Sequence, residues 1–184
     1  MYGMTVSLDG YVAGSGGQMD WTVPDEELHQ HFNDLEREID VALYGRRLYE
    51  DMATFWPTAD EGSSAPTYIA EYAKIWRAQP KVVFSTTLNQ VGWNSTLVRG
   101  NIVEEVEKLK RQPGKTMSVG GLGLAATFMQ YDLIDEYRLY LSPIVLGGGK
   151  PMFPPLQDRI ELELIETRNF SGGVTLLRYQ RRTA

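Results

Sequence analysis

Three short segments of the chain carry residue types that bind phosphate groups in proteins. They are Gly45-Arg46-Arg47, Ser85-Thr86-Thr87 and Gly120-Gly121-Leu122-Gly123. Glycines lack Cβ atoms and let an anion approach the backbone, where the free N–H groups at the start of a following helix carry partial positive charge. Guanidinium groups capture a phosphate through two parallel hydrogen bonds, and hydroxyl groups can donate to phosphate or ribose oxygens. These residue types predict a site for a phosphorylated cofactor.

The three segments share a position in the chain, because each one follows a short apolar run typical of a buried strand. In open α/β sheets, ligands bind beyond the carboxyl ends of the strands, so three such ends can converge on one dinucleotide. The pair Arg46-Arg47 suits the additional phosphate that distinguishes NADPH from NADH. We therefore predict NADPH as the cofactor.

Each segment also has an ordinary structural interpretation. Glycine permits a tight turn between a strand and a helix, Arg46 and Arg47 could pair with Glu50 or Asp51, and Ser or Thr after a strand often caps a turn. The pattern Gly-x-Gly-x-x-Ala at 121–126 matches the Rossmann fingerprint only weakly, since it comes late and lacks an acidic residue about 20 positions further on. The cofactor prediction depends on the convergence of the three segments, and a Rossmann fold is not predicted.

Composition excludes several classes of function. The chain of 184 residues, 42% hydrophobic and 23% charged, fits one folded domain over 1–184. A net charge of −6 without a cluster of basic residues argues against nucleic-acid binding. Cysteine is absent, and His29 and His31 would face different sides of a helix, so we expect neither a disulfide nor a metal site. No signal-like or membrane-spanning apolar run is found, which favours a cytoplasmic protein.

The segments that must position these residues alternate between strand and helix patterns. We expect strands at 4–8, 40–45, 81–85 and 116–119, and helices from Pro24 and at 46–53, 67–77, 102–109 and 124–131. A break at 62–66 precedes the third of these helices. Longer strands follow at 137–142, 162–169 and 174–181, with Gly172-Gly173 as a hairpin turn. The pattern predicts an α/β fold with a mostly parallel central sheet, helices on both of its faces and antiparallel C-terminal strands.

Six stretches together resemble the dihydrofolate-reductase-like superfamily, and more closely the reductase domain at the C-terminal end of the bifunctional riboflavin-pathway deaminase/reductase. They are Ser-Leu-Asp-Gly-Tyr-Val-Ala at 7–13, Gly-Arg-Arg-Leu-Tyr-Glu at 45–50, Val-Val-Phe-Ser-Thr-Thr-Leu at 82–88, Val-Gly-Gly at 119–121, Leu-Ile-Asp-Glu at 133–136 and Ser-Pro-Ile-Val-Leu-Gly-Gly-Gly at 142–149. They follow one another in family order over nearly the whole chain.

The resemblance implies a three-layer α/β/α fold of the dihydrofolate-reductase type, with NADPH laid across the strand ends. It also implies hydride transfer to a pterin-like or (ribosylamino)pyrimidine-like substrate. The cofactor contacts that it implies are Gly45, Arg46, Arg47, Ser85, Thr86, Thr87, Gly120, Gly121, Leu122, Gly123 and Leu124.

Two acids are candidates for the proton that accompanies hydride transfer. The stretch at 19–24, Met-Asp-Trp-Thr-Val-Pro, looks like the loop before the first helix of dihydrofolate reductases, and this likeness places Glu26 where those enzymes keep an active-site acid. Asp9 is the second candidate. An ordinary interpretation exists for both, since Asp9 could serve only as a turn residue and Glu26 only as a favourable charge at a helix N-terminus.

Aromatic residues near the predicted cleft could stack on a flat heteroaromatic substrate. The candidates are Trp21, Tyr49 and Trp56, and for Trp56, which precedes a proline, core packing is the stronger interpretation. The exposed edge of the C-terminal strands could pair with a second copy of the chain, so we expect a homodimer.

The sequence also departs from its relatives in informative ways. Riboflavin-pathway reductases tend to place an arginine for the substrate phosphate early in the first helix, but here residues 25–28 read Asp-Glu-Glu-Leu, which puts a phosphorylated substrate in doubt. Leu48 stands where dihydrofolate reductases usually have threonine, and because the 184 residues include no cysteine, we expect no zinc deaminase domain among them. A dihydrofolate reductase in the strict sense and a non-catalytic NADPH-binding module remain as alternatives.

Overall fold

The computed structural model of the chain describes residues 1–62, 65–114 and 116–182. Its contacts form two compact units, the first made of residues 1–28 and 126–182 and the second of the described residues between 29 and 125. A single domain over 1–184 remains a prediction. The break expected at 62–66 includes Ser63 and Ser64, which lie outside the described residues.

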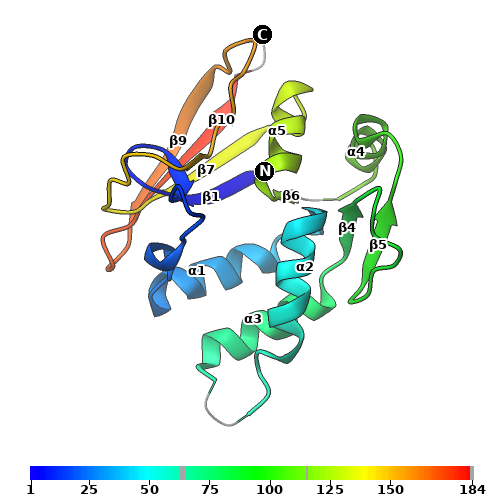
Figure 1. Cartoon of the computed structure of the whole chain (residues 1–184), viewed down its shortest axis with the longest axis horizontal. Coiled ribbons are helices and arrows are strands. Elements are labelled where there is room, and N and C mark those ends of the chain that lie inside the picture. The colour runs from blue at the N-terminus through cyan, green and yellow to red at the C-terminus, as the bar shows by residue number, and fades with distance from the viewer. Residues whose placement is uncertain (63–64, 115, 183–184) are drawn as a thin grey trace. The chain divides into compact units, whose positions relative to one another are not determined.

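The second unit contains four parallel strands in the order β5-β4-β3-β6. The strands are β3 (Val41–Gly45), β4 (Lys81–Phe84), β5 (Ser95–Val98) and β6 (Met117–Gly120). The helices connected to them are α1 (Glu26–Arg37), α2 (Arg46–Phe55), α3 (Thr67–Ala78), α4 (Ile102–Lys110) and α5 (Leu122–Gln130), with the 3-10 turn η2 (Trp56–Thr58) after α2. Helices α1 and α5 carry the chain from one unit to the other (Figure 1).

The core of the second unit explains why these segments fold as they do. Tyr44 and Val83 are buried between the strands and the helices, and Trp76 of α3 is 1% exposed in the same cluster. Lys81 is buried as well, because its ammonium group donates hydrogen bonds to the carbonyl oxygens of Trp76, Gln79 and Trp93. A buried cation is tolerated only when it is paired in this way.

The first unit contains the strands β1 (Tyr2–Val6), β7 (Glu136–Leu141), β10 (Thr175–Arg181) and β9 (Leu162–Asn169), which lie side by side in that order (Figure 1). The pair β1–β7 is parallel, whereas β7–β10 and β10–β9 are antiparallel. Two short strands, β2 (Tyr11–Ala13) and β8 (Lys150–Pro151), form a separate pair, and the 3-10 turn η1 (Asp20–Thr22) precedes α1. The parallel strands with antiparallel C-terminal additions confirm the predicted α/β class.

Element boundaries differ from the expectations mainly at the first strand. β1 ends at Val6 rather than residue 8, because residues 7–10 turn back and the N–H of Gly10 donates to the carbonyl of Ser7. Leu8, expected inside the strand, is 61% exposed. The short strands β2, β5 and β8 were not predicted, whereas the hairpin at Gly172-Gly173 is confirmed, with Gly173 at a φ of 81°. Across the described ranges, the structure contains no helix with the length and apolarity to cross a membrane.

Candidate cofactor and substrate sites

The register of the parallel strands brings the three predicted phosphate-binding segments to one edge of the second unit. Gly45 at the end of β3 pairs with Phe84 at the end of β4, and Tyr44 pairs with Gly120 at the end of β6. Ser85 follows β4 directly. The sequence predicted this convergence from the strand ends alone, and the register confirms it.

Two helices begin at this edge. Helix α2 starts immediately after Gly45, whose backbone serves as N-cap without any side-chain hydrogen bond, and helix α5 starts two residues after Gly120. Neither helix has an acidic residue in its first turn. A helix start without a capping side chain or an acid keeps the partial positive charge that an anion requires.

The glycines at this edge are required by close packing. A Cβ atom at Gly120 would lie 2.5 Å from the Leu48 side chain, and one at Gly121 would lie 3.8 Å from the backbone nitrogen of Gly45. Gly121 also has a φ of +95°, a left-handed conformation that favours glycine. Crowding by neighbouring side chains therefore favours glycine at residue 120, the backbone conformation favours it at residue 121, and a dinucleotide phosphate would approach the backbone at these two positions.

The basic and hydroxyl side chains of the predicted site are only partly committed to other partners. Arg46 forms an exposed ion pair of 3.0 Å with Glu50, which is the alternative pairing foreseen from the sequence, and such pairs contribute little to stability. Arg47 is exposed. The Ser85 hydroxyl accepts hydrogen bonds from the N–H groups of Thr87 and Leu88, so it caps the turn after β4.

Arg99 is a cation at this edge that the sequence did not single out. It follows β5, and its guanidinium group donates to the carbonyl oxygens of Thr86 and Asn89 at 3.4 and 3.3 Å. The parallel pairing of β4 with β5 brings it beside the Ser85 turn. A single arginine after an expected loop has no sequence signal of its own, and the position follows only from the register.

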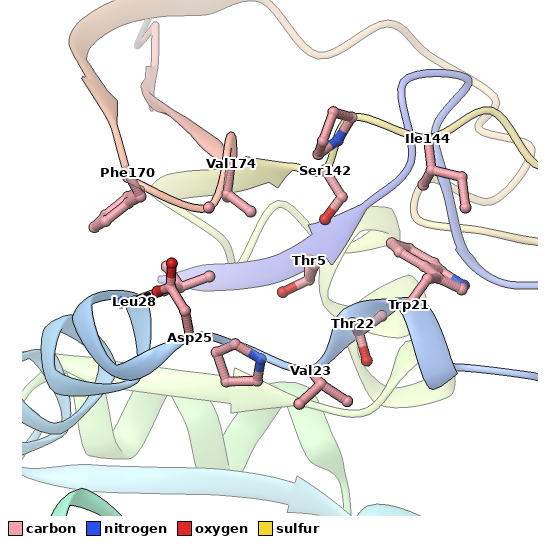
Figure 2. A pocket seen from close by; sticks show the side chains of 13 residues that line it. Thr5, Trp21, Thr22, Val23, Asp25, Leu28, Ser142, Ile144, Phe170 and Val174 are labelled. Carbon is pink, nitrogen blue, oxygen red and sulfur yellow. Dashed lines mark hydrogen bonds between the residues drawn. The ribbon is translucent and has the colours of Figure 1, made fainter.

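A cavity of about 310 Å³ lies in the first unit, a size typical of small-molecule sites. Figure 2 shows Thr5 of β1 and Ser142, which follows β7, on one side of it, with Trp21, Thr22 and Val23 from the segment before α1 on the other. The lining consists of Thr5, Trp21, Thr22, Val23, Pro24, Asp25, Leu28, Ser142, Pro143, Ile144, Phe170, Gly172 and Val174. An apolar wall with a few polar groups suits a flat heteroaromatic ligand.

Asp25 is the carboxylate of this cavity, and it is held in place from two directions. Its Oδ1 accepts a hydrogen bond of 2.9 Å from the N–H of Leu28, so Asp25 caps helix α1. Its Oδ2 accepts a hydrogen bond of 3.1 Å from the hydroxyl of Ser171 in the β9–β10 hairpin. A Cβ atom at Gly172 would lie 2.6 Å from the same oxygen, so only glycine lets the hairpin pass this carboxylate.

Trp21 lines the same cavity, as the predicted substrate-stacking role requires. Its indole Nε1 is buried without a hydrogen-bond partner among the described residues. A buried donor without a partner is costly, and such groups often mark a place where water or a ligand binds.

The two acids predicted for proton transfer are placed outside this cavity lining. Asp9 is exposed, and hydrogen bonds from the Ser7 hydroxyl and from the N–H groups of Leu146 and Gly147 lower the pKa of Asp9. These bonds favour the ionised form and tie the loop after β1 to residues 146–147. Glu26 is exposed in the first turn of α1. The catalytic roles of both acids remain predictions.

The other two predicted substrate contacts, Tyr49 and Trp56, pack in the core of the second unit. Tyr49 is 6% exposed, and its hydroxyl accepts a 2.8 Å hydrogen bond from the N–H of Gly92. The Trp56 ring lies 4.2 Å from that of Tyr72, measured between ring centroids. Both residues therefore have a packing role, which the sequence favoured for Trp56, and contact with a substrate remains a prediction for both.

Residues 1–176 match the RibD C-terminal domain family, and the chain belongs to this family. Among individual proteins, the chain is 37% identical to the uncharacterized protein YyaP of Bacillus subtilis (strain 168) over 177 residues, a match that covers 96% of this chain and 91% of YyaP.

Solved structures of related proteins have the same fold. A crystal structure of a protein from Shewanella sp. PV-4, provisionally named a riboflavin biosynthesis protein, superposes with a TM-score of 0.77 at 25% identity and covers 99% of this chain and 98% of that one. The dihydrofolate reductase of Enterococcus faecalis, solved with NADP(H) and the compound RAB-propyl, superposes with a TM-score of 0.62 at 13% identity, over 99% of this chain and 95% of that one. These likenesses confirm the dihydrofolate-reductase-like fold, and family and fold together support a reductase that acts on a small molecule.

Proposed function

We propose that the chain is an NADPH-dependent reductase that transfers hydride to a pterin-like or (ribosylamino)pyrimidine-like heteroaromatic substrate. The observation that carries this proposal is the shared edge of β3, β4 and β6, where Gly45, Ser85 and Gly120 meet beside two helices whose first turns contain no acidic residue. The likeness to a dihydrofolate reductase solved with NADP(H) gives it further support.

The residues present at this edge fit a phosphorylated dinucleotide. Gly120 and Gly121 have no Cβ atoms, so a pyrophosphate can approach their backbone closely, and Gly121 has the positive φ that favours glycine. Arg46, Arg47 and Arg99 supply positive charge, and the Thr86 and Thr87 side chains are exposed beside them. The cofactor would supply a hydride when bound.

The substrate would bind in the cavity of the first unit. Trp21 and Phe170 provide flat apolar surface, and the Asp25 carboxylate accepts hydrogen bonds from ring nitrogens and amino groups. In this proposal Asp25 orients the ring, and the acid that supplies the proton accompanying hydride transfer, for which the sequence offers Asp9 and Glu26, remains a prediction. The hydroxyl groups of Thr5 and Ser142 add polar contacts from the opposite wall.

Calorimetric titration with NADPH and NADH tests the cofactor half of the proposal. We expect NADPH to bind more tightly than NADH, and the double variant Arg46→Ala/Arg47→Ala to lose at least about tenfold in NADPH affinity, since each charge-assisted contact contributes about 1.5 kcal/mol or more. The matched control is Lys108→Ala/Arg111→Ala, which removes the same charge from exposed positions on and just after α4 of the same unit.

The control should keep its affinity for NADPH within about twofold, because screened charges away from the ligand act weakly. Failure of both nucleotides to bind the wild-type chain would overturn the reductase proposal. Equal losses in the two double variants would show that net charge, and not the edge at β3, controls binding.

A further inference from the structure

The cavity of the first unit has a lining with one sign of charge. Among the described residues that line it, Asp25 is the one acidic residue, and arginine, lysine and histidine are absent. The remaining lining is apolar or bears hydroxyl groups. A bound phosphate needs cations or free N–H groups to replace the water that hydrates it. The side chains that line the cavity provide no cation.

The start of helix α1 beside the cavity does not compensate for the missing cations. The N–H of Leu28 is already bonded to Asp25, and the first turn contains Glu26 and Glu27. Three successive carboxylates at 25–27 oppose the partial positive charge of the helix N-terminus. An anion at this position would meet repulsion where other helix starts attract it.

An arginine of strand β9 near the cavity is paired with an acid that is not a lining residue. Arg168 of β9 lies 3.7 Å from the Glu27 carboxylate, and its guanidinium group lies 4.6 Å from the centre of the Phe170 ring. Glu27 also accepts a hydrogen bond from the N–H of Ser171. Arg168 is not itself a lining residue, and the Glu27 carboxylate offsets its positive charge.

We infer that this cavity selects an unphosphorylated heteroaromatic ring, uncharged or cationic, and discriminates against the phosphorylated form of the same ring. The inference rests on the proposed function for the existence of a substrate site, and it narrows the substrate class within that proposal. It separates this chain from reductases that act on phosphoribosyl compounds, since the carboxylates at 25–27 repel the phosphate.

Two matched pairs of ligands test the inference by calorimetry on the full chain, with and without NADP⁺. The first pair is neopterin and neopterin monophosphate, and the second is 5-amino-6-ribitylaminouracil and its 5′-phosphate. Within at least one pair, we expect the unphosphorylated member to bind at least about tenfold more tightly, and this ratio to grow when salt is lowered from about 0.15 M to about 0.02 M, because screening weakens.

A charge-adding variant makes the test specific. Val23 lines the cavity and is 79% exposed, so Val23→Arg places a cation at its rim without disturbing the core. The ratio between the two members of a pair should fall to about threefold or less, because the new guanidinium can pair with the phosphate. Val145→Arg is the control: Val145 is 66% exposed in the same unit but is not a lining residue, and the ratio should not change.

Each outcome decides the question. Equal or tighter binding of the phosphorylated members overturns the inference, and so does the failure of all four compounds to bind while NADPH binding persists and depends on Arg46 and Arg47. In that last case the cofactor half of the proposed function survives. Loss of NADPH binding together with selective binding of an unphosphorylated ring would overturn the reductase proposal and leave the inference standing.

Discussion

Replacing Asp25 by asparagine separates the two tasks of this residue, which caps helix α1 and lines the cavity. Asparagine is as good an N-cap as aspartate, so the hydrogen bond to the N–H of Leu28 should persist. The variant loses the favourable interaction of a negative charge with the helix start, about 0.3 to 1 kcal/mol, while the Ser171 hydroxyl, which donates to Oδ2 of Asp25, can rotate to accept from the new amide group. We therefore expect the free energy of unfolding to fall by less than about 1 kcal/mol in urea titrations.

Ligand binding should respond much more strongly than stability. A hydrogen bond to an ionised carboxylate is worth about 1.5 to 3 kcal/mol, against about 1 kcal/mol between neutral groups. A ring that donates two N–H groups to Asp25 should then lose about 2 kcal/mol in the variant, which is about 30-fold in Kd. Calorimetric titration with 2,4-diaminopteridine, which carries such donors, measures this change.

The matched control is Glu26→Gln, which removes the same charge one residue further along. Glu26 is exposed and does not line the cavity, so this variant should keep the ligand Kd within about twofold of the wild-type value. An unchanged Kd in Asp25→Asn would refute the role of Asp25 as the ring-binding carboxylate. Equal weakening in both variants would point to the general charge of the helix start, and a larger effect in Glu26→Gln would restore the acid predicted from the sequence.

Three further changes test how the fold supports these sites. Burial lowers the pKa of the Lys81 ammonium group from 10.5 to about 8, so the unfolded chain binds this proton more tightly than the folded chain does. The free energy of unfolding of the wild type, relative to that of Lys81→Met, should therefore rise by about 2 kcal/mol between pH 7 and pH 10 in urea titrations. Stabilities of the two proteins that change in parallel with pH would contradict this. Gly149→Ala would place a Cβ atom 2.0 Å from the carbonyl oxygen of Ala13 and should lower the free energy of unfolding, measured by thermal unfolding, by at least about 2 kcal/mol. The control Gly148→Ala, whose Cβ atom would lie 3.6 Å from the Ser15 hydroxyl oxygen, should lower the free energy of unfolding much less. Asp9→Ala should speed hydrogen exchange at the amides of Leu146 and Gly147, because both donate hydrogen bonds to this carboxylate. Unchanged exchange rates would argue against a role of Asp9 in tying the loop after β1 to residues 146–147.

Much of the fold could be predicted from the sequence because the relevant signals are local. Alternation of apolar runs with helical periods located the strands β3, β4 and β6 and the helices that follow β3 and β6, with errors of a few residues at their ends. The short strands β2, β5 and β8 were not predicted, because two to four residues are too few to show an alternation of apolar and polar residues, and their pairing depends on partners distant in the sequence.

The shared edge at which β3, β4 and β6 end was predictable for a related reason. Glycines and hydroxyl residues after buried strands have a sequence signature, and parallel strands necessarily end on the same side. Gly45, Ser85 and Gly120 therefore met as expected. Arg99 was not predicted as a site residue, because its position beside Thr86 depends on the register of β5, a strand that was not predicted from the sequence.

The sequence by itself indicated the family, the order of the longer elements and the edge at which three strand ends meet. Only the tertiary structure decided which acid lines the cavity of the first unit. Asp25 and Glu26 are neighbours in the chain and both are exposed, but Asp25 precedes α1, and its carboxylate turns back to cap the helix and lines the cavity, whereas Glu26 is the first helical residue and does not line it. That first helical residue, in turn, is fixed by the hydrogen bond to Leu28 and by a hairpin whose contacting residue, Ser171, lies 146 positions away.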